Sequence, residues 1–193
     1  MGIELEVKFR ATEELLEKIR SQAPGQEQIY RMQTTYYDTP SGAYAAKKCT
    51  LRRRLENDKS ICTLKAPAQG FGRREWETEC DTIEEAIEKL CKLQVPQELL
   101  ALAEEGLVPI CGASFTRVAK LVQLQDGTAE LALDQGVLMG GGKEIPLCEI
   151  EVEKKTCSEE ACMAFAEELK ARYGLQLEER SKFKRALDLY RGE

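Results

Sequence analysis

Acidic side chains occupy every second position in two segments of the sequence. They are Glu4 and Glu6, followed by Lys8, near the start of the chain, and Glu149, Glu151 and Glu153 further along. The residues between them are apolar, so each segment has one charged face if it forms a strand. Carboxylate oxygens are the ligands that hard cations such as Mg²⁺ and Mn²⁺ prefer. The spacing therefore indicates a divalent-metal site.

Basic side chains are placed in a similar way on other segments. They are Arg52, Arg54, Lys65 and Arg117. In a strand, Arg52 and Arg54 share one face, opposite Leu51. Several Arg and Lys that converge on a small volume bind a polyanion, and Arg makes bidentate contacts with phosphate. A metal held by acids and phosphates held by bases is the arrangement that phosphoryl transfer requires.

The composition argues against several other functions. The 193 residues include no histidine, and the eight cysteines form no CxxC pair, so His-dependent catalysis is excluded and the cysteines are interpreted as mostly buried apolar residues. The net charge of −6 argues against a general nucleic-acid surface. No apolar run approaches the roughly 20 residues of a membrane span, and the charged N-terminus lacks a signal-like apolar core. We expect a cytoplasmic monomer or homodimer that binds neither nucleic acid nor membrane.

The alternating segments predict the elements that position these residues. Eight strands are expected at about 3–10, 27–38, 48–56, 60–66, 73–80, 113–125, 128–138 and 144–155. Helices are expected at about 12–22, 82–93, 96–105, 158–173 and 181–190, mostly after capping residues. Because most strands are linked as hairpins, the sequence predicts one α+β domain over residues 1–193 with an antiparallel sheet.

Two arrangements explain the charged faces of the strands. In an ordinary sheet the apolar face packs on helices and the polar face is solvated, and periodicity alone favours this arrangement. In a closed barrel the apolar faces point outward and the charges line the interior. The polar faces consist of Arg, Lys and Glu rather than Ser or Thr. The acids Glu149, Glu151 and Glu153 share one strand, and the bases Arg52, Arg54 and Lys65 lie on other, neighbouring strands. These features favour the barrel, and eight strands enclose about one small ligand.

The ordered set of charged strands resembles the CYTH domain, the family of triphosphate tunnel metalloenzymes. The motifs run from Glu4-Leu5-Glu6-Val7-Lys8 through Leu51-Arg52-Arg53-Arg54 and Thr63-Leu64-Lys65 to Glu149-Ile150-Glu151-Val152-Glu153 and Ser181-Lys182. A single ExExK motif is weakly specific, but the ordered set spans nearly the whole chain. The resemblance implies an eight-stranded antiparallel β-barrel that forms a tunnel with a charged interior, with helices packed outside it.

The resemblance also implies a role for each charged residue. Phosphates would contact Lys8, Arg52, Arg54, Lys65 and Arg117, with Lys182 near the terminal phosphate. Glu149 and Glu151 would bind the catalytic Mg²⁺ or Mn²⁺. A second metal or a water would be held by Glu4, Glu6 and Glu75, with Glu77 as the alternative to Glu75. Glu4, Glu6, Lys8 and Lys182 are thus the expected catalytic residues.

The sequence does not decide the role of three acids or the consequence of one residue on a predicted strand. Glu130, Asp134 and Glu153 serve either the site or only as salt-bridge partners. The family often has a second basic residue two positions after Arg117, where this chain has Ala119. Either Lys120 takes this place through a bulge, or the phosphate is held with one fewer cation, which bears on affinity and chain-length preference.

The resemblance is strongest to the bacterial inorganic triphosphatase branch. It implies hydrolysis of inorganic triphosphate to pyrophosphate and phosphate, with a metal-bound water polarised by Glu4 or Glu6 that attacks the terminal phosphorus. The alternatives on the same fold are a class IV adenylate cyclase and a thiamine or nucleoside triphosphatase. An alternative of another class is a non-catalytic module that binds polyphosphate or nucleotides.

Overall fold

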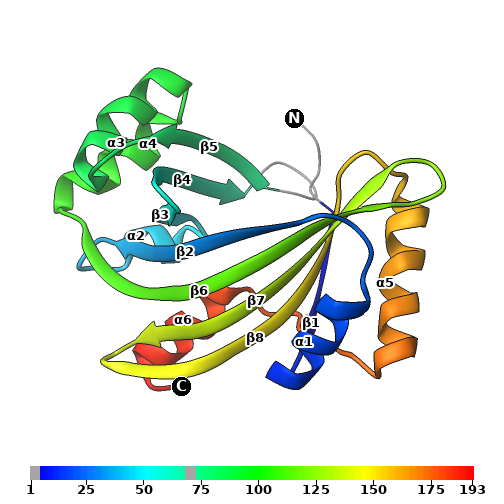
Figure 1. The fold of residues 1–193 in the computed structure, drawn as a ribbon. Coiled ribbons are helices and arrows are strands. Elements are labelled where there is room, and N and C mark those ends of the chain that lie inside the picture. The colour runs from blue at the N-terminus through cyan, green and yellow to red at the C-terminus, as the bar shows by residue number, and fades with distance from the viewer. Residues whose placement is uncertain (1–4, 68–72) are drawn as a thin grey trace. The chain divides into compact units, whose positions relative to one another are not determined.

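The computed structural model describes residues 5–67 and 73–193, and its strands form one sheet. The strands are β1 (Glu6–Arg10), β2 (Glu27–Asp38), β3 (Thr50–Glu56), β4 (Lys59–Pro67), β5 (Arg73–Glu79), β6 (Val108–Gln123), β7 (Thr128–Gly140), β8 (Lys143–Lys154) and β9 (Gln176–Leu177). The helices are α1 (Glu13–Gln22), α2 (Ala43–Ala46), α3 (Ile83–Leu90), α4 (Gln97–Leu100), α5 (Glu159–Tyr173) and α6 (Lys182–Arg191), with short 3-10 turns at Cys91–Leu93 and Ala101–Glu105. Figure 1 shows their course along the chain.

The expected α+β class and antiparallel sheet are confirmed, and all eight expected strands are present. The sheet of the described residues has a ninth strand, the two-residue β9, and its order is β5-β4-β3-β2-β6-β7-β8-β1-β9. Hydrogen bonds do not close this sheet into the expected barrel, because β5 and β9 are its two ends. β9 pairs with β1 through Leu177 and Gln176 alone.

The chain divides into two compact units, each built from distant segments. The first unit contains residues 1–31, 115–137 and 145–181, and the second contains residues 32–114, 138–144 and 182–193. The long strands β2, β6, β7 and β8 contribute residues to both units. Each unit has its own apolar core and is described by itself below.

The core of the first unit lies between strands and two helices. Phe9 of β1 and Ile150 and Val152 of β8 are fully buried and belong to one apolar cluster with Leu16 of α1 and Ala166 of α5. Figure 1 shows α1 and α5 lying next to each other in this unit. The apolar residues at every second position of β1 and β8 thus face these helices, as the alternation predicts.

The core of the second unit follows the same rule. Leu51 of β3 and Leu64 of β4 pack with Ile83, Ala86 and Leu90 of α3. In Figure 1, α3 and α4 lie beside β4 and β5. The opposite face of β3 and β4 is therefore the one that carries Arg52, Arg54 and Lys65, because neighbours along a strand point to opposite faces.

Capping side chains fix the predicted starts of three helices. The hydroxyls of Thr12, Thr82 and Ser158 accept hydrogen bonds from backbone N–H groups in the first turns of α1, α3 and α5. The short helix α2 was not predicted. The buried carboxylate of Asp38 holds its start by accepting hydrogen bonds from the N–H groups of Thr39, Tyr44 and Ala45.

The cysteines behave as the sequence indicates. All eight have free thiols, and six of them are buried, the exceptions being Cys91 and Cys148. Burial raises the pKa of Cys62 and Cys111 to about 12, so these thiols stay protonated at neutral pH. They therefore pack as small apolar groups.

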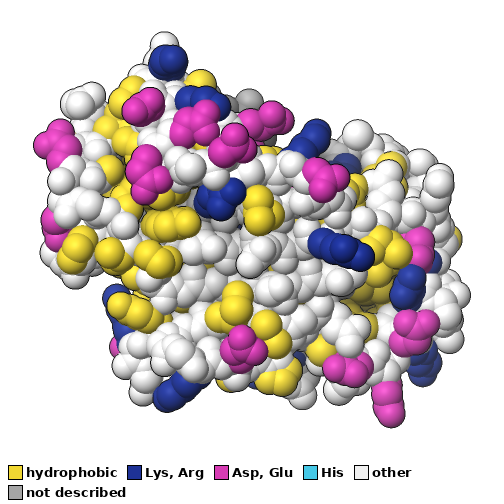
Figure 2. All heavy atoms as spheres, turned by 60° about the vertical axis from the view of Figure 1, so that its left-hand side comes forward, with side chains coloured by type: hydrophobic (Ala, Val, Ile, Leu, Met, Phe, Trp, Pro, Cys, Tyr) yellow, Lys and Arg dark blue, Asp and Glu magenta, His cyan; other side chains and the backbone are white. Residues whose placement is uncertain are grey.

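No helix in the described parts of the chain is long and apolar enough to cross a membrane. The face in Figure 2 carries acidic and basic side chains interspersed with hydrophobic ones.

Lys120 of β6 has a structural role at the end of α1. The side chain is buried, and its Nζ donates to the carbonyl oxygens of Arg20 at 2.6 Å and Ala23 at 2.9 Å. These carbonyls belong to the last turn and the C-cap of α1, where a positive charge and a donor are both favourable. No bulge therefore turns Lys120 to the face of Arg117, and Ala119 is the residue that shares that face.

Replacing Lys120 with Met should destabilise the fold, because two carbonyls lose a buried donor. We expect the free energy of unfolding to fall by about 2 kcal/mol in urea denaturation. Lys143→Met, at an exposed position of β8, is the control and should change this free energy by less than about 0.5 kcal/mol. Equal effects of the two substitutions would contradict the capping role.

Candidate active site

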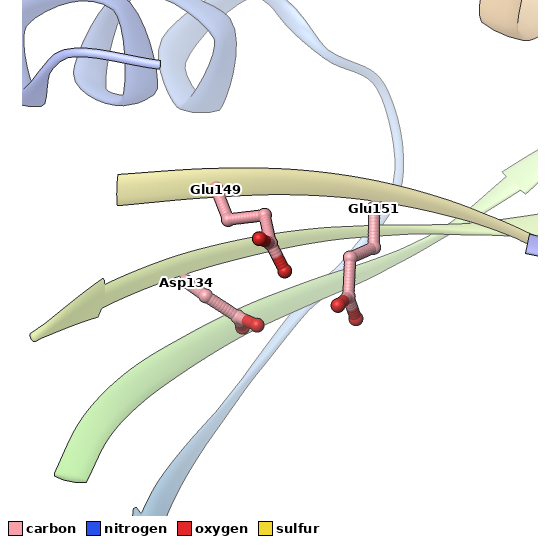
Figure 3. Close-up of side chains that lie close together, drawn as sticks. All are labelled: Asp134, Glu149 and Glu151. Atoms are coloured by element: carbon pink, nitrogen blue, oxygen red, sulfur yellow. The ribbon is translucent and has the colours of Figure 1, made fainter. Parts of the chain in front are cut away.

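Three carboxylates of the first unit point toward one another. They belong to Asp134 of β7 and to Glu149 and Glu151 of β8, and one oxygen of each lies within 4.8 Å of the others. Figure 3 shows the three side chains converging from the two strands. Asp134 and Glu149 have exposed fractions of 0%, and Glu151 of 7%.

The burial of these acids is inconsistent with one of the two arrangements expected for the charged face of β8, the solvated face of an ordinary sheet. Ile150 and Val152, on the opposite face of the strand, are also fully buried. A solvated polar face is therefore wrong for this part of β8. Removing an isolated charged carboxylate from water costs several kcal/mol of desolvation free energy. The cluster therefore requires compensating positive charge.

Arg117 of β6 supplies part of that charge. Its Nε donates to Asp134 Oδ1 at 2.8 Å, and its Nη2 donates to Asp134 Oδ2 at 2.7 Å and to Glu151 Oε2. Burial works against the charged form, but the hydrogen bond to Asp134 and the charge of Glu151 outweigh it and raise the pKa of Arg117 above its ordinary value. The ring of Phe115 lies 5.9 Å from the guanidinium carbon and supports it from one side.

The donor set of the cluster fits a hard divalent cation. Its groups are all carboxylates, which supply oxygen ligands to Mg²⁺, Mn²⁺ or Ca²⁺ and are unsuited to soft metals. Counted as ionised, the three carboxylates outnumber the one guanidinium of Arg117 bonded to them, and a divalent cation would reduce this imbalance of charge. The identity of such a metal does not follow from the donors.

Strand β1 lies beside the cluster in the first unit. It pairs with β8 so that Lys8 lies opposite Glu151, Arg10 opposite Glu149 and Glu6 opposite Glu153. Directly opposed residues share a face, so Lys8 lies on the face of the acidic cluster. Glu6 is exposed at the start of the strand. Glu4, the other acid of the motif, is outside the described residues.

The three acids that the sequence left open divide into two groups. Asp134 joins Glu149 and Glu151 in the cluster. Glu130 and Glu153 instead pair with Lys155, whose Nζ lies 3.6 Å from Glu130 Oε2 and 2.9 Å from Glu153 Oε1. Asp134 was thus the cluster residue that the sequence did not single out as a metal ligand. The only signal for it was its place on the polar face of β7.

The second unit collects basic residues on one face of β3 and β4. The register places Arg52 opposite Thr63 and Arg54 opposite Ile61, and it places Lys65 opposite Glu75 of β5. Lys65 Nζ lies 2.9 Å from Glu75 Oε1, and Arg52 Nη2 lies 4.0 Å from the same oxygen. Arg52 Nε is buried without a hydrogen-bond partner in the described structure. A buried donor of this kind suits an anionic ligand.

The register places Glu75 and Glu77 on the same face, where they have different partners. Both lie on the face of the basic residues, because Glu77 pairs with Thr63 and accepts a hydrogen bond from its hydroxyl at 2.8 Å. Glu75 is the partner of Lys65 and Arg52. Arg53 is on the opposite face and donates to Ser60.

Lys182 is the first residue of α6 and is buried. The helix is held in the second unit by Phe183, whose ring lies 4.8 Å from that of Tyr36 on β2. Gly140 of β7 also approaches α6 closely, because a Cβ on it would lie 2.4 Å from the carbonyl oxygen of Ala186. These contacts fix the start of α6 and so the position of Lys182 in that unit.

The family model for the CYTH domain matches residues 2–187. The chain belongs to the CYTH domain family. A Haemophilus influenzae protein named inorganic triphosphatase is 32% identical over 154 residues, a match that covers 78% of this chain and 44% of that protein. The chain thus spans less than half the length of this relative.

Solved structures agree on the fold. A Bacillus halodurans protein named for adenylate cyclase superposes with a TM-score of 0.65 at 21% identity, covering 95% of this chain and 97% of that one. A Hippeastrum protein, named for adenylyl cyclase and for a dominant triphosphatase activity, superposes with a TM-score of 0.64 at 21% identity, covering 100% and 96%. A Pyrococcus horikoshii protein gives 0.63 at 22% identity, covering 97% and 99%. At these identities the likeness shows the fold alone.

A metal bound by the acidic cluster should stabilise the protein. At Mn²⁺ concentrations about 100-fold above the dissociation constant, the expected stabilisation is about 2.7 kcal/mol, measured as a rise in Tm that EDTA reverses. Glu149→Gln should lose most of this rise, whereas Glu130→Gln, outside the cluster, should keep it. Equal Mn²⁺-dependent shifts in both variants would show that the metal binds elsewhere.

Proposed function

We propose that this chain hydrolyses inorganic triphosphate to pyrophosphate and phosphate with Mg²⁺ or Mn²⁺. The observation that carries the proposal is the cluster of three buried carboxylates, which lies on strands of a CYTH domain. The identity to the Haemophilus influenzae protein named inorganic triphosphatase supports the choice of substrate.

In this mechanism Asp134, Glu149 and Glu151 hold the metal. The metal, when bound, neutralises phosphate charge and lowers the pKa of a coordinated water. In the first unit, Lys8 and Arg117 are the proposed phosphate ligands. In the second unit, the proposed phosphate ligands are Arg52, Arg54, Lys65 and Lys182. Glu6, and Glu4 before it, are the proposed groups that orient the attacking water. The work of the protein is positioning and charge neutralisation, as is usual for phosphoryl transfer.

A panel of phosphate-release assays tests this proposal. Inorganic triphosphate, long-chain polyphosphate, ATP and thiamine triphosphate are each incubated with Mg²⁺ and with Mn²⁺. We expect inorganic triphosphate to be cleaved with the highest kcat/KM. Cyclic AMP from ATP would identify a cyclase, and tight triphosphate binding without phosphate release would identify a non-catalytic module.

Glu151→Gln should lower kcat for triphosphate by at least about 100-fold, because it removes one charged ligand of the proposed metal. Glu153→Gln is the matched control, since Glu153 is two residues away on the same face of β8 and is paired with Lys155. Its kcat should fall by less than about threefold. Full metal-dependent turnover by Glu151→Gln would refute the metal assignment.

Arg52 and Arg53 form a second matched pair, because neighbours on β3 point to opposite faces. Arg52→Met should raise KM for triphosphate by about 10- to 100-fold, because it removes one or two charge-assisted hydrogen bonds to phosphate. Arg53→Met should leave KM nearly unchanged. Steady-state kinetics with saturating metal measure both values, and equal effects would contradict a phosphate-binding face on β3.

A further inference from the structure

The guanidinium of Arg117 is bonded to two of the three carboxylates of the acidic cluster. Its Nη2 contacts both Asp134 Oδ2, at 2.7 Å, and Glu151 Oε2, so that one nitrogen bridges two of the three carboxylates. A divalent cation takes carboxylate oxygens at about 2.0–2.6 Å. A metal held between Asp134 and Glu151 would therefore compete with Nη2 for the same position.

The contact with Glu151 is the one that Arg117 can give up most easily. Asp134 accepts two hydrogen bonds from the guanidinium, through Nε and Nη2, whereas Glu151 accepts one from it. Nε can keep Asp134 Oδ1 while Nη2 moves, and the ring of Phe115 continues to support the group. A small rotation of the guanidinium thus releases Glu151 without breaking the pair with Asp134.

The released nitrogen remains positively charged beside the cluster. An arginine guanidinium stays protonated at physiological pH, so Arg117 keeps its charge when it loses a partner. Its preferred new partner is an oxyanion with two or more acceptor oxygens, and phosphate is the chemical class that fits.

We propose that Arg117 is a built-in competitor of the metal that couples metal binding to phosphate binding. The proposal rests on the proposed function for the metal site. Metal binding breaks the contact between Arg117 and Glu151, and the released guanidinium donates to a phosphate oxygen. By thermodynamic linkage, phosphate must then strengthen metal binding by the same factor.

The test measures Mn²⁺ binding to the full chain in the absence of triphosphate. The EPR signal of the Mn²⁺ that remains free in solution reports the binding. Arg117→Met removes the competing cation and should bind Mn²⁺ about tenfold more tightly than the unsubstituted protein. Lys155→Met is the control, because it removes an equal charge next to Glu153 and Glu130, outside the cluster. It should change the Mn²⁺ affinity by less than about twofold.

A second titration in the presence of inorganic phosphate tests the coupling. Phosphate should increase the Mn²⁺ affinity of the unsubstituted protein by a certain factor. This factor should be at least about threefold larger than the one for Arg117→Met. If Arg117→Met binds Mn²⁺ with equal or lower affinity than the unsubstituted protein, Arg117 does not compete with the metal. An equal phosphate effect on both proteins overturns the coupling.

Circular dichroism establishes that each variant is folded. If Arg117→Met does not fold, Arg117→Lys takes its place, because lysine keeps the charge but lacks the planar fork that bridges two carboxylates. Tighter Mn²⁺ binding is again expected, and equal or weaker binding again overturns the proposal. Neither titration depends on turnover, so a lack of phosphate release in the substrate panel would refute the proposed function separately.

Discussion

The burial of like charges is the constraint on which the first unit depends. Asp134, Glu149 and Glu151 are removed from water at mutual distances where carboxylates repel, and their solvation has to be replaced by other groups. Asp134 and Glu151 are paired with Arg117, but a third buried carboxylate beside them adds repulsion, so stability alone does not account for all three. A cluster that costs free energy in the fold is typical of a binding site.

The two units meet this constraint in the same way. In the first unit Asp134 and Glu151 are paired with Arg117, and in the second unit Lys65 is paired with Glu75. These candidate binding groups therefore already have a partner of opposite charge within their own unit. Binding of a metal or a phosphate then exchanges one ion pair for another, which lowers the desolvation cost of burying the ligand but also lowers the net gain in affinity.

The alternation of residue types was enough to predict the strands and the face on which each charged residue lies. Pairing partners were not predictable, because they depend on register, which tertiary packing sets. Glu75 and Glu77 have the same alternation and the same face, and only the pairing of β4 with β5 shows which of them reaches Lys65. The helix α2 was missed for a related reason, since its start is held by Asp38 and not by a residue within a helical pattern.

Strand β6 shows how structural and functional demands compete for the same charges. Its two basic residues are both bonded within the first unit, Lys120 to carbonyls at the end of α1 and Arg117 to Asp134 and Glu151. Ala119, on the face of Arg117, offers no charge in place of a second base. Any phosphate contact made by β6 must therefore come from Arg117 and must be made at the expense of an existing ion pair. Because Lys120 is tied to the end of a helix, Arg117 is the residue of β6 whose charge can be redistributed when a ligand binds.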